Sequence, residues 1–110
     1  RNEGFLAQIE AAAASAGEQV WRLPLPEEYR DSYRSQIADM KNIGGSYGGA
    51  LTAGLILGEF VAEGIPWAHL DIAGPARAES DNGELTEGGT GFGVRTLVEL
   101  ARSFEKPTVE

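Results

Sequence analysis

The sequence predicts an α/β fold in which helices flank a mostly parallel sheet. Three observations lead to this prediction: residues 67–74 alternate apolar and polar side chains like a strand, residues 50–63 resemble a helix, and residues 37–42 extend before it. A helix between two strands is typical of a right-handed crossover in a parallel sheet. The apolar pattern of residues 37–42 is weak, and a helical continuation of the preceding turn is an open alternative.

Helices are also expected near both ends of the chain. Apolar residues between Phe5 and Ala16 recur at helical spacing, and Gly17 follows where a left-handed residue would end the helix. Residues 93–104 carry a single apolar stripe, which predicts an amphipathic helix. That stripe consists of Val94, Leu97, Val98, Ala101 and Phe104.

Proline and glycine divide the segment between these helices. Residues 19–25 are expected to extend, and Pro26 precedes two acidic residues that suit the first turn of a short helix. Gly54 and Gly58 lie inside the helix expected at residues 50–63. Each glycine costs a helix roughly 0.5–1 kcal/mol relative to alanine, so another part of the chain is expected to approach the backbone closely there.

Composition limits the classes of function. The 110 residues carry a formal charge of −8, which disfavours nucleic acids and anionic membranes as partners. No cysteine is present, so disulfides, thiolate nucleophiles and cysteine-based zinc sites are excluded. No apolar run approaches the roughly 18 residues of a membrane span. We therefore expect a cytoplasmic protein that does not bind nucleic acid or enter a membrane.

Few residues suggest chemistry by themselves. His69 and Asp71 share one face of the expected strand, an arrangement that could orient a base, although a packing role is the commoner reading. The glycine-rich residues 88–93 precede a helix but match neither phosphate-binding fingerprint. Ligands in open α/β sheets bind beyond the carboxyl ends of parallel strands, where Ile43 and Ala73 are expected. Small apolar residues there suit one wall of an apolar pocket.

Four segments together resemble the C-terminal region of the M17 leucyl aminopeptidases. They are WRLPL at residues 21–25, SQIADMKNIG at 35–44, WAHLDIAG at 67–74 and GGTGFGVRTL at 88–97, and they occur in the order typical of that family. The small-residue segment at 51–60 also matches. The resemblance implies that residues 1–110 are the C-terminal part of the catalytic domain of a larger peptidase.

The resemblance also implies an activity. Members of this family use two divalent metal ions, Mn or Zn, to remove N-terminal residues from peptide substrates, with a preference for leucine, and they assemble as homohexamers. The family's metal-binding and catalytic motifs, among them NTDAEGR, do not occur here. We therefore expect no catalytic residue and no metal ligand in this chain, and we expect the chain alone to be inactive.

Three residues match positions that line the family's pocket for the N-terminal side chain of the substrate: Ile43, Ala73 and Ala76. The alternative is that these residues only pack the edge of the sheet. A second function also stays open, namely a structural or interaction module without peptidase activity.

Overall fold

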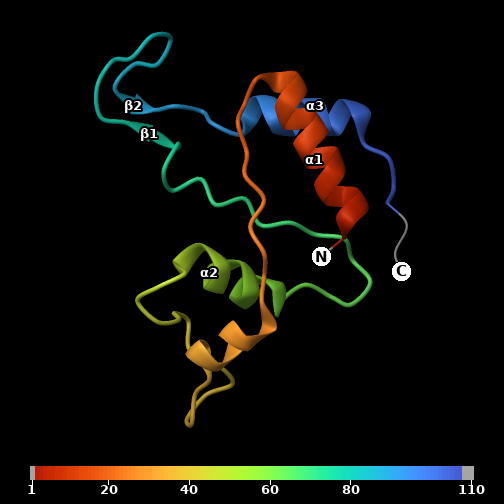
Figure 1. Cartoon of the computed structure of the whole chain (residues 1–110), viewed down its shortest axis with the longest axis vertical. Coiled ribbons are helices and arrows are strands. Elements are labelled where there is room, and N and C mark those ends of the chain that lie inside the picture. The colour runs from red at the N-terminus through yellow and green to blue at the C-terminus, as the bar shows by residue number, and fades with distance from the viewer. Residues whose placement is uncertain (1, 108–110) are drawn as a thin grey trace.

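The elements of the computed structural model, which describes residues 2–107, group at two ends of the molecule. In Figure 1, α1 and α3 lie side by side at one end, and α2 lies at the other end beside the short 3₁₀ helix η1. Two long extended segments connect these ends. The bounds are α1 Glu3–Ala16, η1 Glu27–Tyr33, α2 Gly49–Gly58, β1 Arg77–Ala78, β2 Gly88–Gly89 and α3 Val94–Ser103.

The first helix follows its local sequence signals. The side chain of Asn2 accepts a hydrogen bond from the Phe5 amide at 2.9 Å, which caps the N-terminus of α1. Gly17 ends the helix with φ at 70°, a left-handed conformation in which a side chain would be strained. Ile9, Ala12 and Ala13 are buried. The helix predicted between Phe5 and Ala16 is thus confirmed.

Contacts between the first turns of α1 and the residues that follow α3 help to hold these two helices together. The rings of Phe5 and Phe104 meet edge to face with centroids 6.2 Å apart. The side-chain amide of Gln8 donates to the Glu105 carbonyl at 2.8 Å and accepts from the Glu105 amide at 2.9 Å. The predicted last helix is confirmed, but large side chains of its apolar stripe remain about half exposed, among them Val94, Leu97, Val98 and Phe104.

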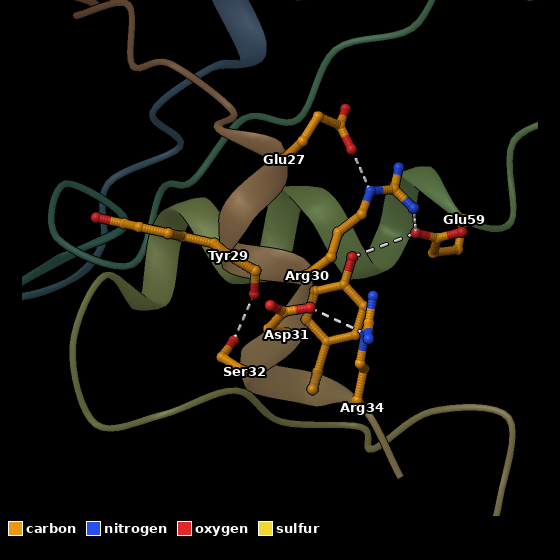
Figure 2. A network of polar contacts seen from close by, with 8 residues as sticks. Glu27, Tyr29, Arg30, Asp31, Ser32, Arg34 and Glu59 are labelled. Carbon is orange, nitrogen blue, oxygen red and sulfur yellow. Dashed lines mark hydrogen bonds and ion pairs between the residues drawn. The ribbon is translucent and has the colours of Figure 1, made fainter.

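The short helix η1 is held against the end of α2 by a cluster of charged groups, as Figure 2 shows. Arg30 contacts the carboxylates of both Glu27 and Glu59, and the buried Tyr33 donates from its hydroxyl to Glu59 at 3.2 Å. Glu27, Arg30 and Tyr33 belong to η1, and Glu59 directly follows α2. The cluster therefore joins segments that are distant in sequence, and the short helix predicted after Pro26 is confirmed.

Close packing explains the glycines of α2. A Cβ atom on Gly54 would lie 2.9 Å from Leu25, and one on Gly58 would lie 2.5 Å from the Trp67 ring. Both distances are shorter than real Cβ contacts, so the expected close approach is confirmed. The helix ends at Gly58, earlier than the predicted 50–63, because the next amides bond to carbonyls three residues back and tighten the chain into turns.

Replacing Gly58 by alanine should destabilise the chain by about 1–2 kcal/mol, since the clash with Trp67 outweighs the better helix propensity of alanine. Urea unfolding followed by far-ultraviolet circular dichroism measures this change. Gly49→Ala is the matched control, because nothing lies within 4 Å of a Cβ at that position of the same helix. Adding Trp67→Leu to Gly58→Ala should recover part of the loss; equal stability of the two alanine variants would contradict the prediction.

The predicted parallel sheet is not formed within residues 2–107. The one sheet there pairs β1 with β2 in antiparallel register, with Arg77 opposite Gly89 and Ala78 opposite Gly88. Residues 67–72 extend as predicted but lack a strand partner, and residues 37–42 form bends. Neither strand is therefore formed within these residues: alternation of side chains in residues 67–72 does not supply the hydrogen-bonded neighbour that a strand needs, and residues 37–42, whose strand prediction rested on a weak pattern, bend instead of extending. The mixture of helices with a small sheet agrees with the broader α/β class.

None of the helices described meets the length and hydropathy that crossing a bilayer requires. The longest, α1, has 14 residues.

Candidate functional site

An open groove runs between the chain's extended segments and the first helix. Its volume is about 940 Å³, and it is lined by one side of α1, by the extended residues 19–25, by the first residues of α2 and by residues 67–75. Most of its surface is apolar. Trp21 is the most exposed of its large side chains, with 87% of the residue accessible to solvent.

Charged groups form one rim of this groove. The guanidinium of Arg22 makes two hydrogen bonds to the Glu10 carboxylate, at 3.1 and 2.7 Å, and one to Glu3 at 2.5 Å. Both glutamates belong to α1. These hydrogen bonds, foremost those that Arg22 donates to Glu10, raise the pKa of Arg22 above its already high ordinary value. Arg22 therefore stays charged and ties the extended segment to the side of α1.

The chain turns at one end of the groove, where two of the predicted pocket residues lie. Asp71 accepts a hydrogen bond from the Ala73 amide at 3.1 Å, and the Ala76 amide donates to the Ile72 carbonyl at 2.9 Å. The Ala76 carbonyl in turn accepts from the Thr90 amide at 3.0 Å. Local hydrogen bonds thus fix the backbone of both alanines. Ala73 is exposed and lines the groove, whereas Ala76 is half-buried and does not.

Ile43, the third predicted pocket residue, lies on a separate loop and is 71% exposed. The loop is anchored by Gly44, where an added Cβ would approach Ser32 and Thr52 to 3.0 Å. Ile43 is not among the residues that line the groove. The described residues therefore bring Ala73 and Ala76 to one turn and leave Ile43 apart, so a pocket shared by all three remains a prediction.

The described residues contain no group that fits a metal ion. No cluster of three or more histidine, cysteine, aspartate or glutamate side chains occurs within residues 2–107. Asp71 serves as a turn acceptor, and the buried Nε2 atom of His69 has no hydrogen-bond partner in this part of the chain. Asp71 and His69, which the sequence suggested as a possible pair, therefore share no hydrogen bond within residues 2–107.

Sequence reasoning missed the most buried carboxylate. The side chain of Glu18 is 2% exposed and accepts hydrogen bonds at the N-terminus of α3 from the Gly93 amide at 3.0 Å, the Thr96 amide at 3.0 Å and the Thr96 hydroxyl at 2.5 Å. Arg95 adds an ion pair at 3.7 Å. Glu18 therefore caps the N-terminus of α3, where Gly93 lies 75 residues later in the chain, and nothing in the sequence next to Glu18 indicates this role.

The Thr96 hydroxyl is the largest single influence on this carboxylate. Its hydrogen bond lowers the pKa of Glu18; burial opposes the shift, and the amides of Thr96 and Gly93 and the charge of Arg95 reinforce it. The net direction is downward, so Glu18 is ionised at neutral pH. The group is fully occupied by its capping partners, which makes it a structural rather than a reacting carboxylate.

Comparison with known proteins places this fold among peptidases. Residues 1–98 match the cytosol aminopeptidase family, catalytic domain. A probable cytosol aminopeptidase of Alkaliphilus metalliredigens is 57% identical over 105 residues, which are 96% of this chain and 21% of that protein. A tomato leucine aminopeptidase variant superposes with a TM-score of 0.80 at 42% identity, over 89% of this chain and 18% of the other.

A second solved structure agrees more closely in shape. The bottromycin maturation enzyme BotP, determined in complex with Mn, superposes with a TM-score of 0.89 at 42% identity, over 96% of this chain and 23% of that protein. The chain belongs to the cytosol aminopeptidase family, as its resemblance to the M17 enzymes predicted. It spans about a fifth of the length of the curated relatives that it matches.

Proposed function

We propose that residues 1–110 form the C-terminal part of the catalytic domain of an aminopeptidase that releases N-terminal residues, with a preference for leucine, from peptides. The observation that carries this proposal is the family match over residues 1–98, together with 57% identity to a probable cytosol aminopeptidase. The chain would contribute part of the sheet, one apolar wall of the substrate pocket and contacts between subunits of a homohexamer. We also propose a cytoplasmic location, which the names of these relatives support.

The wall of the pocket is proposed to include Ile43, Ala73 and Ala76. Ala73 lines the apolar groove, and hydrogen bonds through Thr90 hold the backbone of Ala76 beside it. Small side chains at this turn leave room for an apolar side chain of a substrate, and burial of that side chain would supply binding free energy in proportion to its area. Ile43 would join the wall from its separate loop.

The cofactors are proposed to be two divalent metal ions, Mn or Zn, held by residues of the domain that this chain does not contain. Mn is the ion bound to BotP. Residues 2–107 offer no cluster that fits either ion, so the chain's own part in the reaction is to shape the substrate pocket.

The test is hydrolysis of a leucine chromogenic amide with added manganese. A chimera is made in which this chain replaces the matched 105 residues of the Alkaliphilus metalliredigens aminopeptidase, and it is compared with the 110-residue chain alone. We expect chelator-sensitive hydrolysis by the chimera and none by the short chain. A folded but inactive chimera would favour the second candidate, a module without peptidase activity. Hydrolysis by the short chain would contradict the proposal that the catalytic and metal-binding residues lie outside it.

A further inference from the structure

The loop between β1 and β2 contains a tight turn at Asn82 and Gly83. The Asn82 amide donates to the Leu85 carbonyl at 2.9 Å, and the Leu85 amide donates to the Asn82 carbonyl at 3.0 Å. Gly83 has φ at 61°, and glycine at the first central position is typical of a type II′ hairpin turn. Residues 79–87 are all exposed, and Figure 1 shows the loop projecting beyond β1 and β2, away from the helices.

Two groups of this turn that can react with each other have no other partner. Within residues 2–107, neither the side-chain amide of Asn82 nor the backbone amide of Gly83 makes a hydrogen bond. Apart from the chain neighbours, nothing lies within 4 Å of a Cβ atom built on Gly83. The Gly83 nitrogen is therefore unobstructed on its approach to the side-chain carbonyl carbon of Asn82, which lies on the preceding residue.

The other two asparagines of the sequence lack this combination. The side-chain oxygen of Asn2 is held at the N-terminus of α1 by the Phe5 amide at 2.9 Å. Asn42 is exposed, but it is followed by Ile43, whose β-branched side chain is stiff and crowds its own backbone nitrogen. Among the three, Asn82 alone joins a side chain without a partner in residues 2–107 to an unhindered neighbouring nitrogen.

We propose that Asn82 is a site of spontaneous deamidation, which converts it to aspartate and isoaspartate. The Gly83 nitrogen attacks Cγ of Asn82: the N–Cγ bond forms, the Cγ–Nδ2 bond breaks, and Nδ2 leaves as ammonia with the proton of the Gly83 amide. The product is a five-membered succinimide ring, which water then opens. Cleavage of the new N–Cγ bond gives aspartate, and cleavage of the original peptide bond gives isoaspartate. Water is the only co-reactant, and nothing is oxidised or reduced.

The hairpin slows this reaction without preventing it. Its two hydrogen bonds between Asn82 and Leu85 fix the backbone of Asn82, so the ring closes when this bridge opens. Asp81 restrains the loop further by accepting a hydrogen bond from the Glu87 amide at 2.9 Å. Exposed loops open at a small cost in free energy. Deamidation is therefore expected in the folded chain, at a lower rate than in the unfolded chain.

The two products should change the loop differently. Aspartate leaves the main chain unaltered, so the bridge to Leu85 persists. Isoaspartate adds a methylene carbon to the main chain and turns the Asn82 carbonyl into a free carboxylate, so the bridge is lost. Glu84 of the same turn lies 3.9 Å from the Arg95 guanidinium, and opening the turn would also weaken this pair. Exposed ion pairs contribute little to stability, so the change should stay within the loop.

Mass spectrometry of tryptic peptides tests the site. Cleavage after arginine and lysine places the three asparagines on separate peptides, residues 2–22, 42–77 and 78–95. During incubation at neutral pH, peptide 78–95 should deamidate at least about tenfold faster than peptide 42–77, a difference of about 1.4 kcal/mol in activation free energy. The same order is expected in the 110-residue chain and in the chimera described above. A sample digested without incubation corrects for conversion during digestion.

Two variants test the chemistry of the turn. Asn82→Gln keeps an amide in the turn but would have to close a six-membered ring, so the conversion of peptide 78–95 should be lost. Ile43→Gly places glycine after Asn42 and should accelerate the conversion of Asn42 by about tenfold. Unchanged conversion of Asn42 in this variant would contradict the steric argument and overturn the proposal.

The remaining outcomes are decisive without any measurement of peptidase activity. Equal rates at Asn82 and Asn42 in the unsubstituted chain would overturn the proposal. Aspartate without isoaspartate would also overturn it, because the succinimide opens to both products. Conversion of Asn82 in the short chain but not in the chimera would show that the rest of the enzyme protects this loop, which would overturn the proposal for the enzyme.

Discussion

Replacing Thr96 by valine should destabilise the pair of α1 and α3 by about 1.5–3 kcal/mol, the usual worth of a hydrogen bond to a charged group. The Thr96 hydroxyl donates to Glu18 at 2.5 Å, and Thr96 is only 2% exposed. Valine has nearly the same shape, so packing is preserved and the loss reports on the hydrogen bond. The Glu18 carboxylate would remain buried with one donor fewer, which is more costly than losing a contact at the surface.

Urea unfolding followed by far-ultraviolet circular dichroism measures this effect. Thr86→Val is the matched control, because Thr86 lies exposed in the loop between β1 and β2, and its replacement should change stability by less than about 0.5 kcal/mol. If the two valine variants unfold at the same urea concentration, the capping interaction does not hold α3 in place.

Glu18→Gln should remove a pH-dependent part of the stability. The hydrogen bond from Thr96 and the neighbouring donors lower the pKa of Glu18 in the folded chain. The unfolded chain therefore binds a proton at a higher pH than the folded chain does. The stabilisation is fully present above the ordinary glutamate pKa of about 4.3 and is lost as the pH falls through the lower, folded value.

The measurement is the thermal unfolding midpoint between about pH 7 and about pH 3, an interval that spans the ordinary carboxyl pKa. The unsubstituted chain should lose stability steeply below the ordinary pKa, whereas Glu18→Gln should begin less stable and change less across that interval. Glu79→Gln, on the exposed loop, is the control and should follow the unsubstituted chain. Parallel curves for Glu18→Gln and the unsubstituted chain would show that Glu18 does not make the expected contribution.

Local signals predicted the helices well. Gly17, the helical spacing between Phe5 and Ala16 and the stripe of residues 93–104 depend on contacts within a few residues, which can be read from the sequence directly. Gly54 and Gly58 also predicted a tertiary contact: because glycine destabilises a helix, its presence there correctly indicated that another part of the chain packs close to the backbone. The sequence could not identify that neighbour as Leu25 at one position and Trp67 at the other.

The pairing of strands and the positions of the site residues were less predictable, because both depend on contacts between segments that are distant in sequence. The alternation in residues 67–74 correctly predicted an extended chain, but it cannot specify which strand pairs with it, and no strand within residues 2–107 does. Ala73 lines the apolar groove, but its role in the wall of a substrate pocket remains a prediction. Ile43 lies on a loop whose path depends on the packing of Gly44 against Thr52, which no local pattern indicates.

The sequence by itself determined the positions of the main helices, the classes of partner that its charge disfavours, and the family, through four motifs in their characteristic order. Only the tertiary structure decided that Glu18 caps α3 across 75 residues, that Gly58 admits the Trp67 ring, and that residues 19–25 and 67–71 border an open groove. The physical reason is the separation in sequence of the residues that interact. Helix formation and local capping depend on residues a few positions apart. Packing, strand pairing and the capping of α3 by Glu18 join distant segments and therefore depend on how the whole chain is folded.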